Sequence, residues 1–279
     1  MWQNNGCSLF STVSRKDKTY IYFGRQSNFM PYKCGLSDFD HLETPLGRIM
    51  VDKSVNQKLL KSDDFRLIES NNDLKEQFIE MQLPFIAKIM ENRKYLYTVV
   101  PVYIGALSHE QQRFIAKHFL PYLNDPSNVF IFSVSLIHWG EIYGMNTIHP
   151  ETTTVLETIK KLDDLAITAL SSLRFKSFDE FLLDTKSCVY DYQVYNICLW
   201  IIQQFLDEDL YYLRNLDEEK AKKAMRKTAS FCLQGQTWSF PSVTKDDSCI
   251  SFISASIIFD EEKYIPDEPL PLNPLDKCV

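Results

Sequence analysis

The sequence predicts an α/β protein with a central mixed β-sheet flanked by helices, and three observations predict this class. β-Branched and aromatic runs alternate with amphipathic segments through the middle of the chain. Two of the runs are apolar on both faces, which is typical of strands that are covered on both sides. The 279 residues, 45% hydrophobic and 24% charged, are enough to bury one large core, so a single domain is expected.

Four segments are predicted to be strands because β-branched and aromatic residues dominate them and turn residues bound them. They are TYIYF at 19–23, YTVVPVYI at 97–104, NVFIFSV at 128–134 and SCISFISASIIF at 248–259. The second and third are apolar on both faces. We therefore expect these two in the centre of the sheet.

Five segments show helical periodicity. Apolar side chains recur on one face of residues 72–90, where Pro84 should kink or divide the helix. Ser108 is the expected N-cap of a helix that ends near residue 123. Further helices are expected at 152–170, 177–183 and 190–205. The last of these is apolar nearly all round, so it should be buried.

The two ends of the chain differ from the middle. Residues 1–18 show no period, and residues 260–279 are acidic and contain four prolines. Prolines lack the N–H that helices and strands require. We therefore expect flexible segments at 1–18 and 260–279, on either side of an α/β domain at 19–259.

Composition argues against several classes of protein. The net charge is −7 and the pI is about 5.3, whereas a surface that binds nucleic acid or anionic lipid is normally basic. No apolar run approaches the ~20 residues that span a bilayer. The seven cysteines are odd in number and contain no CxxC pair, which fits neither a disulfide framework nor a structural zinc site. We expect a cytoplasmic protein, with the nucleus as a second compartment, that is not inserted in a membrane.

Three residues are candidates for chemistry. His138 follows the strand at 128–134, and ligands bind at the carboxyl ends of strands in α/β sheets, although a structural histidine under Trp139 is the simpler interpretation. Cys188 precedes the buried helix, whose dipole would favour a thiolate, but buried apolar cysteines are commoner. Glu80 lies among apolar neighbours, so its carboxylate either pairs internally or faces solvent.

Four segments together resemble the Memo family, which is named for a vertebrate mediator of ErbB2-driven cell motility. They are KEQFIEMQLPFIAKIM, VVPVYIGALS, YLNDPSNVFIFSVSLIHWG and DSCISFISASIIF, and the likeness runs from about residue 20 to residue 259. The resemblance implies the LigB-like fold of class III extradiol dioxygenases. It also implies a pocket of histidines and a cysteine linked to iron or copper, and an adaptor role toward a phosphotyrosine-containing receptor segment.

The pocket positions that the resemblance implies are only partly kept. The family's SSDFCHWG is SVSLIHWG here, which retains His138 but places Ser135 at the position of the acid. The family's HSIEMHLP is QFIEMQLP here, which retains Glu80 but replaces both histidines, by Gln77 and Gln82. The cysteine before the buried helix is retained as Cys188.

Two further departures lie near the start of the chain. The paired histidines of the family's GPSHHVP fall on Asn28 and Phe29 of GRQSNFMP. The family's first strand, which ends in a PHAGY-like segment with another pocket histidine, has no counterpart before TYIYF. The resemblance therefore implies an N-terminally shortened member. Either residues 3–14 fill the slot of that strand, or the chain is a shortened gene product of lower stability.

These changes predict a degenerate metal site. Amide oxygens are poor substitutes for imidazole at iron or copper, so only His138 and Cys188 remain as good donors. We therefore expect a divergent, non-catalytic Memo-like protein without a cofactor, acting through protein partners as an adaptor or scaffold.

Two alternatives remain open. One is an iron- or copper-dependent oxidoreductase with an altered site of His138, Cys188 and Glu80. The other is a peptide-binding module that uses the old pocket, where the neutral side chains of Asn28, Gln77 and Gln82 offer hydrogen bonds.

Overall fold

The computed structural model describes most of the chain, namely residues 18–25, 32–68, 77–93, 96–221, 223–240, 244 and 246–264. Nearly all of the two segments expected to be flexible ends therefore falls outside the described residues, as do Asn28 and the side chain of Gln77. The chain forms two compact units. Unit 1 comprises Met1–Ser135 and Tyr190–Cys198, and unit 2 comprises Leu136–Val189 and Leu199–Val279.

Unit 1 is built on a mixed seven-stranded sheet, which confirms the predicted fold class. Its main path has the order β3-β4-β6-β1-β7, and β2 pairs with both β6 and β5. The strands are β1 (Lys18–Arg25), β2 (Cys34–Leu36), β3 (His41–Thr44), β4 (Gly47–Val51), β5 (Phe65–Leu67), β6 (Tyr97–Ile104) and β7 (Asn128–Phe132). β1 runs parallel to β6 on one side and to β7 on the other.

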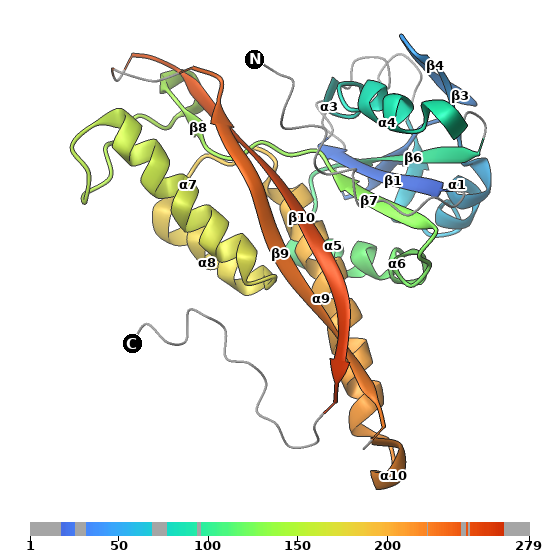
Figure 1. The fold of residues 1–279 in the computed structure, drawn as a ribbon. Coiled ribbons are helices and arrows are strands. Elements are labelled where there is room, and N and C mark those ends of the chain that lie inside the picture. The colour runs from blue at the N-terminus through green and yellow to red at the C-terminus, as the bar shows by residue number, and fades with distance from the viewer. Residues whose placement is uncertain are drawn as a thin grey trace. The chain divides into compact units, whose positions relative to one another are not determined.

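Helices cover both faces of this sheet. They are α1 (Lys53–Leu59), α3 (Gln77–Glu80), α4 (Leu83–Ile89), α5 (His109–Lys117) and α6 (Leu120–Leu123), and a 3₁₀ turn, η1, occupies Glu91–Arg93. Ile79 and Leu83 pack with Tyr22 in one core cluster, on the face that α3 and α4 cover in Figure 1. On the other face, the ring of Phe119 meets that of Phe23 edge-on, with 4.8 Å between the ring centroids.

Two local helix signals of unit 1 are confirmed, but the single helix predicted from Ser108 to about residue 123 is divided into α5, which ends at Lys117, and α6, where Pro121 lies in the first turn. Pro84 divides the predicted helix at 72–90, because α3 ends at Glu80 and Pro84 lies in the first turn of α4. The side chain of Ser108 accepts a hydrogen bond from the N–H of Gln111, whose side chain accepts one from the N–H of Ser108. This reciprocal pair satisfies two backbone donors at the start of α5.

The prediction that residues 128–134 form a central strand is wrong. β7 lies at the end of the sheet order, and β1 is its strand neighbour among the described residues. All five of its residues are half-buried, whereas Tyr20 to Phe23 of β1 are completely buried. Aromatic packing explains the apolar sequence of β7, because Phe130 and Phe132 both stack on Phe23.

Unit 2 combines helices with a long β-ribbon. Its elements are β8 (His138–Trp139), η2 (Glu141–Tyr143), α7 (Val155–Ser171), α8 (Phe175–Thr185), α10 (Glu218–Ala221), β9 (Met225–Trp238) and β10 (Cys249–Lys263). The buried helix predicted at 190–205 is confirmed as α9 (Tyr192–Arg214), which is longer than expected. Its first residues belong to unit 1 and the rest, from Leu199, to unit 2.

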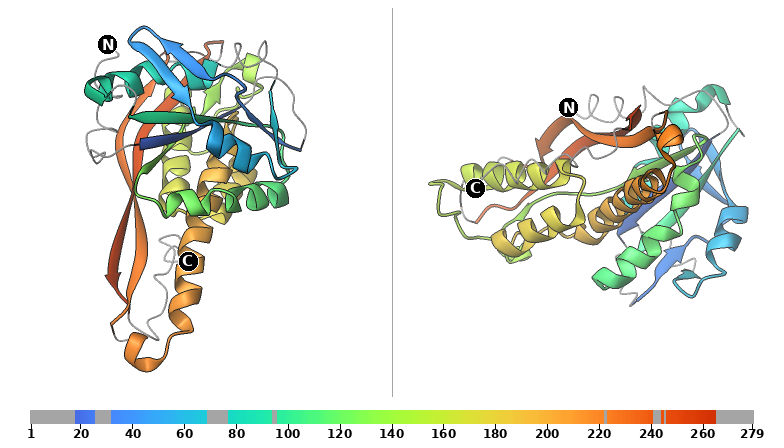
Figure 2. Two further views of the ribbon diagram at one scale, coloured as in Figure 1. Left: turned by 90° about the vertical axis from the view of Figure 1, so that its right-hand side faces the viewer. Right: turned by 90° about the horizontal axis from the view of Figure 1, so that it is seen from below.

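The antiparallel ribbon of β9 and β10 runs beside the later turns of α9 (Figure 2). One of its faces packs on that helix, where the ring of Phe259 meets the ring of Phe205 at 5.3 Å and Lys227 Nζ lies 4.2 Å above the same ring. Polar pairs, such as the ion pair of Arg226 with Glu262, lie on the alternate positions. β10 also extends to Lys263, so the predicted boundary at residue 259 falls inside a strand.

In the part of the chain that the structure describes, no helix combines the length and the hydropathy needed to cross a bilayer.

Candidate functional site

His138 is held in unit 2 by contacts on several sides. It lies in β8, opposite Ile250 of β10, and its side chain is buried. Its ring Nδ1–H donates to the carbonyl of Leu136 at 3.3 Å, since a carbonyl oxygen can only accept. The ring also meets that of Tyr143 edge-on, with 4.9 Å between the centroids. These contacts fit the structural interpretation of this histidine.

Cys188 lies beside His138, as a shared site would require. The backbone N–H of His138 donates to the carbonyl of Cys188 at 2.9 Å, and the Cys188 thiol donates to the carbonyl of Tyr143 at 3.2 Å. However, α9 begins only at Tyr192, four residues after Cys188. The expectation that Cys188 sits at the N-terminus of this helix is therefore wrong, and the helix dipole gives no argument for a thiolate there.

Trp139 and Gly140 serve packing and turn geometry. Trp139 is completely buried in a cluster with Val155, Ile159 and Cys249. Gly140 has φ of 127°, and a Cβ there would lie 3.0 Å from Cβ of Ser248. Only glycine combines that backbone conformation with so close an approach. The His-Trp-Gly sequence thus fastens the segment from β8 onward to the ribbon.

Ser135 anchors a buried acid that sequence reasoning missed. The N–H of Ser135 donates to Oδ2 of Asp191 at 2.7 Å, and its hydroxyl donates to the same oxygen. Asp191 is 1% exposed, and its Oδ1 makes no hydrogen bond in the described structure. The position where the family resemblance implies an acid thus holds a serine that binds an acid from another segment.

Asp191 lies at the carboxyl ends of the parallel strands of unit 1. The Arg25 guanidinium, at the end of β1, lies 5.1 Å from the ring centroid of the adjacent Tyr190. The hydroxyl of Ser133, just beyond β7, donates to the carbonyl of Phe78 at 2.8 Å. This edge of a parallel sheet is the usual place for ligands. One sequence signal pointed to Asp191, since an acid directly before a long apolar helix is a typical N-cap.

Two further predicted residues lie in unit 1. Glu80 is exposed on α3, so the solvent-facing alternative is the correct one. Gln82 is half-buried before α4, and its side chain makes no capping hydrogen bond. Both residues belong to unit 1, whereas His138 and Cys188 belong to unit 2.

The residues that the structure describes do not fit an iron or copper centre. Within them, no three His, Cys, Asp or Glu side chains come together as a ligand set. His138 and Cys188 supply one imidazole and one thiol, whereas metal centres in proteins normally use three or four protein ligands. No chemical step through a metal is therefore derived.

A second buried acid joins α7 to the ribbon in unit 2. Oδ2 of Asp163 accepts hydrogen bonds from the side-chain amide of Gln236 at 2.8 Å and from the indole N–H of Trp238 at 3.0 Å. Burial raises the pKa of Asp163 to about 6, although these hydrogen bonds favour the ionised form. The arrangement is a structural clamp whose strength depends on pH.

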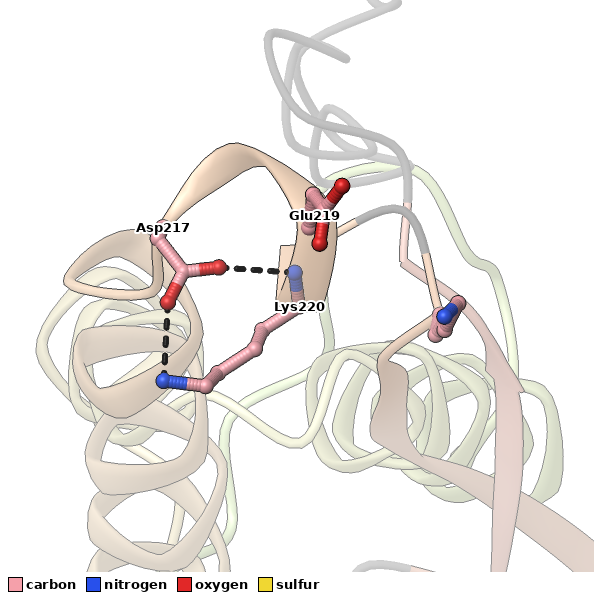
Figure 3. Close-up of a pocket in the computed structure, with 4 residues that line it drawn as sticks. Asp217, Glu219 and Lys220 are labelled. Carbon is pink, nitrogen blue, oxygen red and sulfur yellow. Dashed lines mark hydrogen bonds and ion pairs between the residues drawn. The ribbon is translucent and has the colours of Figure 1, made fainter.

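A pocket lies beside α10, at the far end of the ribbon (Figure 3), and its volume is about 490 Å³. Its lining carries two acids and two lysines, Asp217, Glu219, Lys220 and Lys223. Lys220 Nζ lies 2.8 Å from Oδ2 of Asp217, whose other oxygen accepts from the Lys220 N–H. Asp217 and Lys220 thus pair with each other at the turn into α10.

Comparison with known proteins shows one consistent likeness. A family model described as Memo-like protein matches residues 6–225. The chain is 33% identical to human "Protein MEMO1" over 150 residues, which are 54% of this chain and 50% of that protein. It is 32% identical to the Caenorhabditis elegans "Protein memo-1 homolog" over 157 residues, 56% of this chain and 44% of that protein. The chain thus spans about half the length of the curated relatives it matches.

Proposed function

Because this chain belongs to the Memo family, we propose that it acts as a non-catalytic adaptor or scaffold in signalling, cell motility or cytoskeletal organisation, in the cytoplasm and the nucleus. The observation that carries the proposal is the pairing of Ser135 with Asp191. Ser135 stands at a pocket position of the family, and here it stabilises the fold, because both its N–H and its hydroxyl donate hydrogen bonds to Asp191.

The chemistry of the neighbouring positions supports the same function. Gln77 and Gln82 stand where the resemblance implies histidines. An amide neither titrates near neutral pH nor donates a nitrogen lone pair to a metal, so proton transfer and metal binding both lose their groups. Meanwhile the core of unit 1 is completely buried, so the fold persists where that chemistry has gone.

A phosphotyrosine-containing segment of a receptor is the partner class that we propose by family analogy. Arg25 is the residue that suits it, because a guanidinium binds phosphate through two parallel hydrogen bonds. Its side chain lies at the carboxyl end of β1, against Tyr190.

Fluorescence anisotropy with a labelled phosphotyrosine peptide and its unphosphorylated twin tests this partner class. The proposal expects binding of the phosphorylated peptide that Arg25→Ala weakens about tenfold, a loss of roughly 1.4 kcal/mol. Arg48→Ala, on an exposed strand of the same unit, is the matched control. Equal binding of both peptides, or equal effects of both substitutions, would refute the phosphotyrosine proposal.

The rival function is a metal-dependent oxidoreductase, which one observation favours. His138 and Cys188 are adjacent, and the Leu136 carbonyl holds the proton of the imidazole on Nδ1. A backbone carbonyl commonly orients a metal-binding histidine in this way. Oxygen uptake by protein incubated with iron or copper, in the presence of catechols, tests this function. Uptake that His138→Ala abolishes would establish the oxidoreductase and displace the scaffold.

A further inference from the structure

The outer edge of β10 is covered only at its start. β8 pairs with Cys249 and Ile250, and the backbone of Ser251 exchanges two hydrogen bonds with residues 136 and 137. From Phe252 to Lys263, within the described chain, β9 on the opposite side is the strand partner of β10. A run of twelve residues thus has no strand partner on its outer side within the described chain.

The direction of the backbone groups on this edge follows from one hydrogen bond. The N–H of Ser251 donates outward, to the carbonyl of Ile137 at 2.9 Å. Successive residues of a strand point to alternate sides, so the outward groups beyond it belong to every second residue. These are Ile253, Ala255, Ile257, Phe259 and Glu261, and no hydrogen bond of the described chain occupies their outer side.

The two edges of the ribbon differ in how well they are protected from pairing with another chain. On β9 the N–H of Lys227 donates to Oδ2 of Asp209 from α9 at 2.8 Å, and the register shift opposite Ser254 and Ala255 leaves Gln234 as an extra residue in the ladder. Side-chain caps and bulges of this kind keep an edge from pairing with another chain. On β10 the segment 252–259 contains no charge and no proline.

We propose that the β10 edge pairs antiparallel with the β10 edge of a second copy of this chain, about a two-fold axis near Ile257. In this register Ala255 lies opposite Phe259 of the second copy, and the acids 260–262 lie opposite the uncharged residues 252–254. Ala255 thus meets Phe259, Ile257 meets its own copy, and no two like charges face each other. The inference goes beyond the proposed function, because it needs no partner but this chain.

Two considerations select a second copy as the occupant. The chain's own segment after β10 carries four prolines, which lack the N–H that a ladder needs. Pairing also turns two ribbons into one four-stranded sheet, and sheets of three or more strands with an apolar face are much more stable than isolated hairpins. A paired stretch of eleven residues is about 37 Å long. An interface this narrow is small, so the dimer should be reversible.

Analytical ultracentrifugation of the full chain from about 1 µM to about 500 µM tests the proposal. We expect a monomer–dimer equilibrium that Ile258→Lys weakens at least tenfold, because lysines at 258 of the two copies would be diagonal neighbours on one face. Ile258 is 44% exposed, so the monomer should tolerate the change. Ser230→Lys is the control, since Ser230 is exposed opposite Ile258 but on β9.

Hydrogen exchange on the unmodified protein gives an independent readout. Amides of residues 253–259 should become more protected as concentration rises, whereas those of 229–233 should not change. A monomer throughout the range, equal effects of the two lysine substitutions, or exchange that is independent of concentration would overturn the proposal.

Discussion

The sheet of unit 1 and the ribbon of unit 2 bury their strands to different extents. β1 has a parallel strand on each side and helices on both faces, so Tyr20 to Phe23 are completely buried. β10 has one full-length neighbour and one helix-facing side, and only Cys249, Ser251 and Ser254 of its residues are buried. The first arrangement buries its strand completely, whereas the second buries little of its strand and, among the described residues, leaves most of the outer edge of β10 without a strand partner.

The largest expected effect separates the two regions by packing. Phe23→Ala removes a completely buried ring between Phe119 and Phe132, so we expect a loss of about 3–5 kcal/mol in the free energy of unfolding. Phe231→Ala on the half-buried ribbon should cost about 1–2 kcal/mol. Urea unfolding of both variants measures the difference. Equal losses would show that the ribbon is packed as tightly as the sheet.

The second effect is confined to the ribbon and depends on pH. The pKa of Asp163 is raised from 3.8 to about 6 when the chain folds, because the carboxyl is buried. Protonation therefore favours the folded state, and this contribution is complete below pH 3.8 and lost as the pH rises through 6. A difference of two pKa units corresponds to about 3 kcal/mol.

Unfolding midpoints measured between pH 4 and pH 8 in the unmodified protein and in Asp163→Asn test this contribution. Asparagine keeps an acceptor for Gln236 and Trp238 but cannot titrate. The change of the unfolding midpoint with pH near pH 6 should disappear in the variant. If the midpoint of the variant still changes with pH near 6 as in the unmodified protein, other titrating groups cause that dependence.

The third effect concerns the buried acid of unit 1. Asp191→Ala removes the acceptor for two donors of Ser135, so we expect a loss of about 2 kcal/mol. Asp164→Ala, on the exposed side of α7, should change stability by less than about 0.5 kcal/mol. Thermal unfolding compares the two. A neutral result for Asp191→Ala would mean that the pairing with Ser135 holds nothing in place.

The smallest effect should be the same in both units. Ser108→Ala and Thr154→Ala each remove an N-cap side chain from a capping box, at α5 and α7 respectively. Each should cost about 1 kcal/mol, because the cap satisfies a local backbone donor whatever the surrounding fold. Urea titrations of the two variants measure the loss. Losses that differ several-fold would show that tertiary context outweighs the cap.

Local signals accounted for most elements that the sequence predicted. The capping residue Ser108 and the division at Pro84 are decided by neighbours in the chain, and the buried strand β6 by its continuous apolar run. β9 was not predicted, because its sequence has no regular alternation and Arg226, Lys227 and Gln234 interrupt the apolar residues. β7 was predicted to be central because its sequence is apolar. Its apolar residues pack on the aromatic ring of Phe23, although the strand lies at the end of the sheet order.

The candidate site was less predictable than the fold. The closeness of His138 and Cys188 follows from pairing between distant segments, which no local pattern encodes. The role of Asp191 depends on a hydrogen bond across 56 positions of the sequence. The family resemblance implied an acid at the position of Ser135, and only the structure shows that this serine binds an acid from another segment.

The central claim is that this chain keeps the Memo fold without holding a metal. Mass spectrometry of metal content tests it most directly, on purified folded protein before and after incubation with iron, copper and zinc. His138→Ala/Cys188→Ala is the comparison. The account predicts far less than one metal per chain, with no difference between the two proteins. Near-stoichiometric metal that the double substitution removes would contradict it.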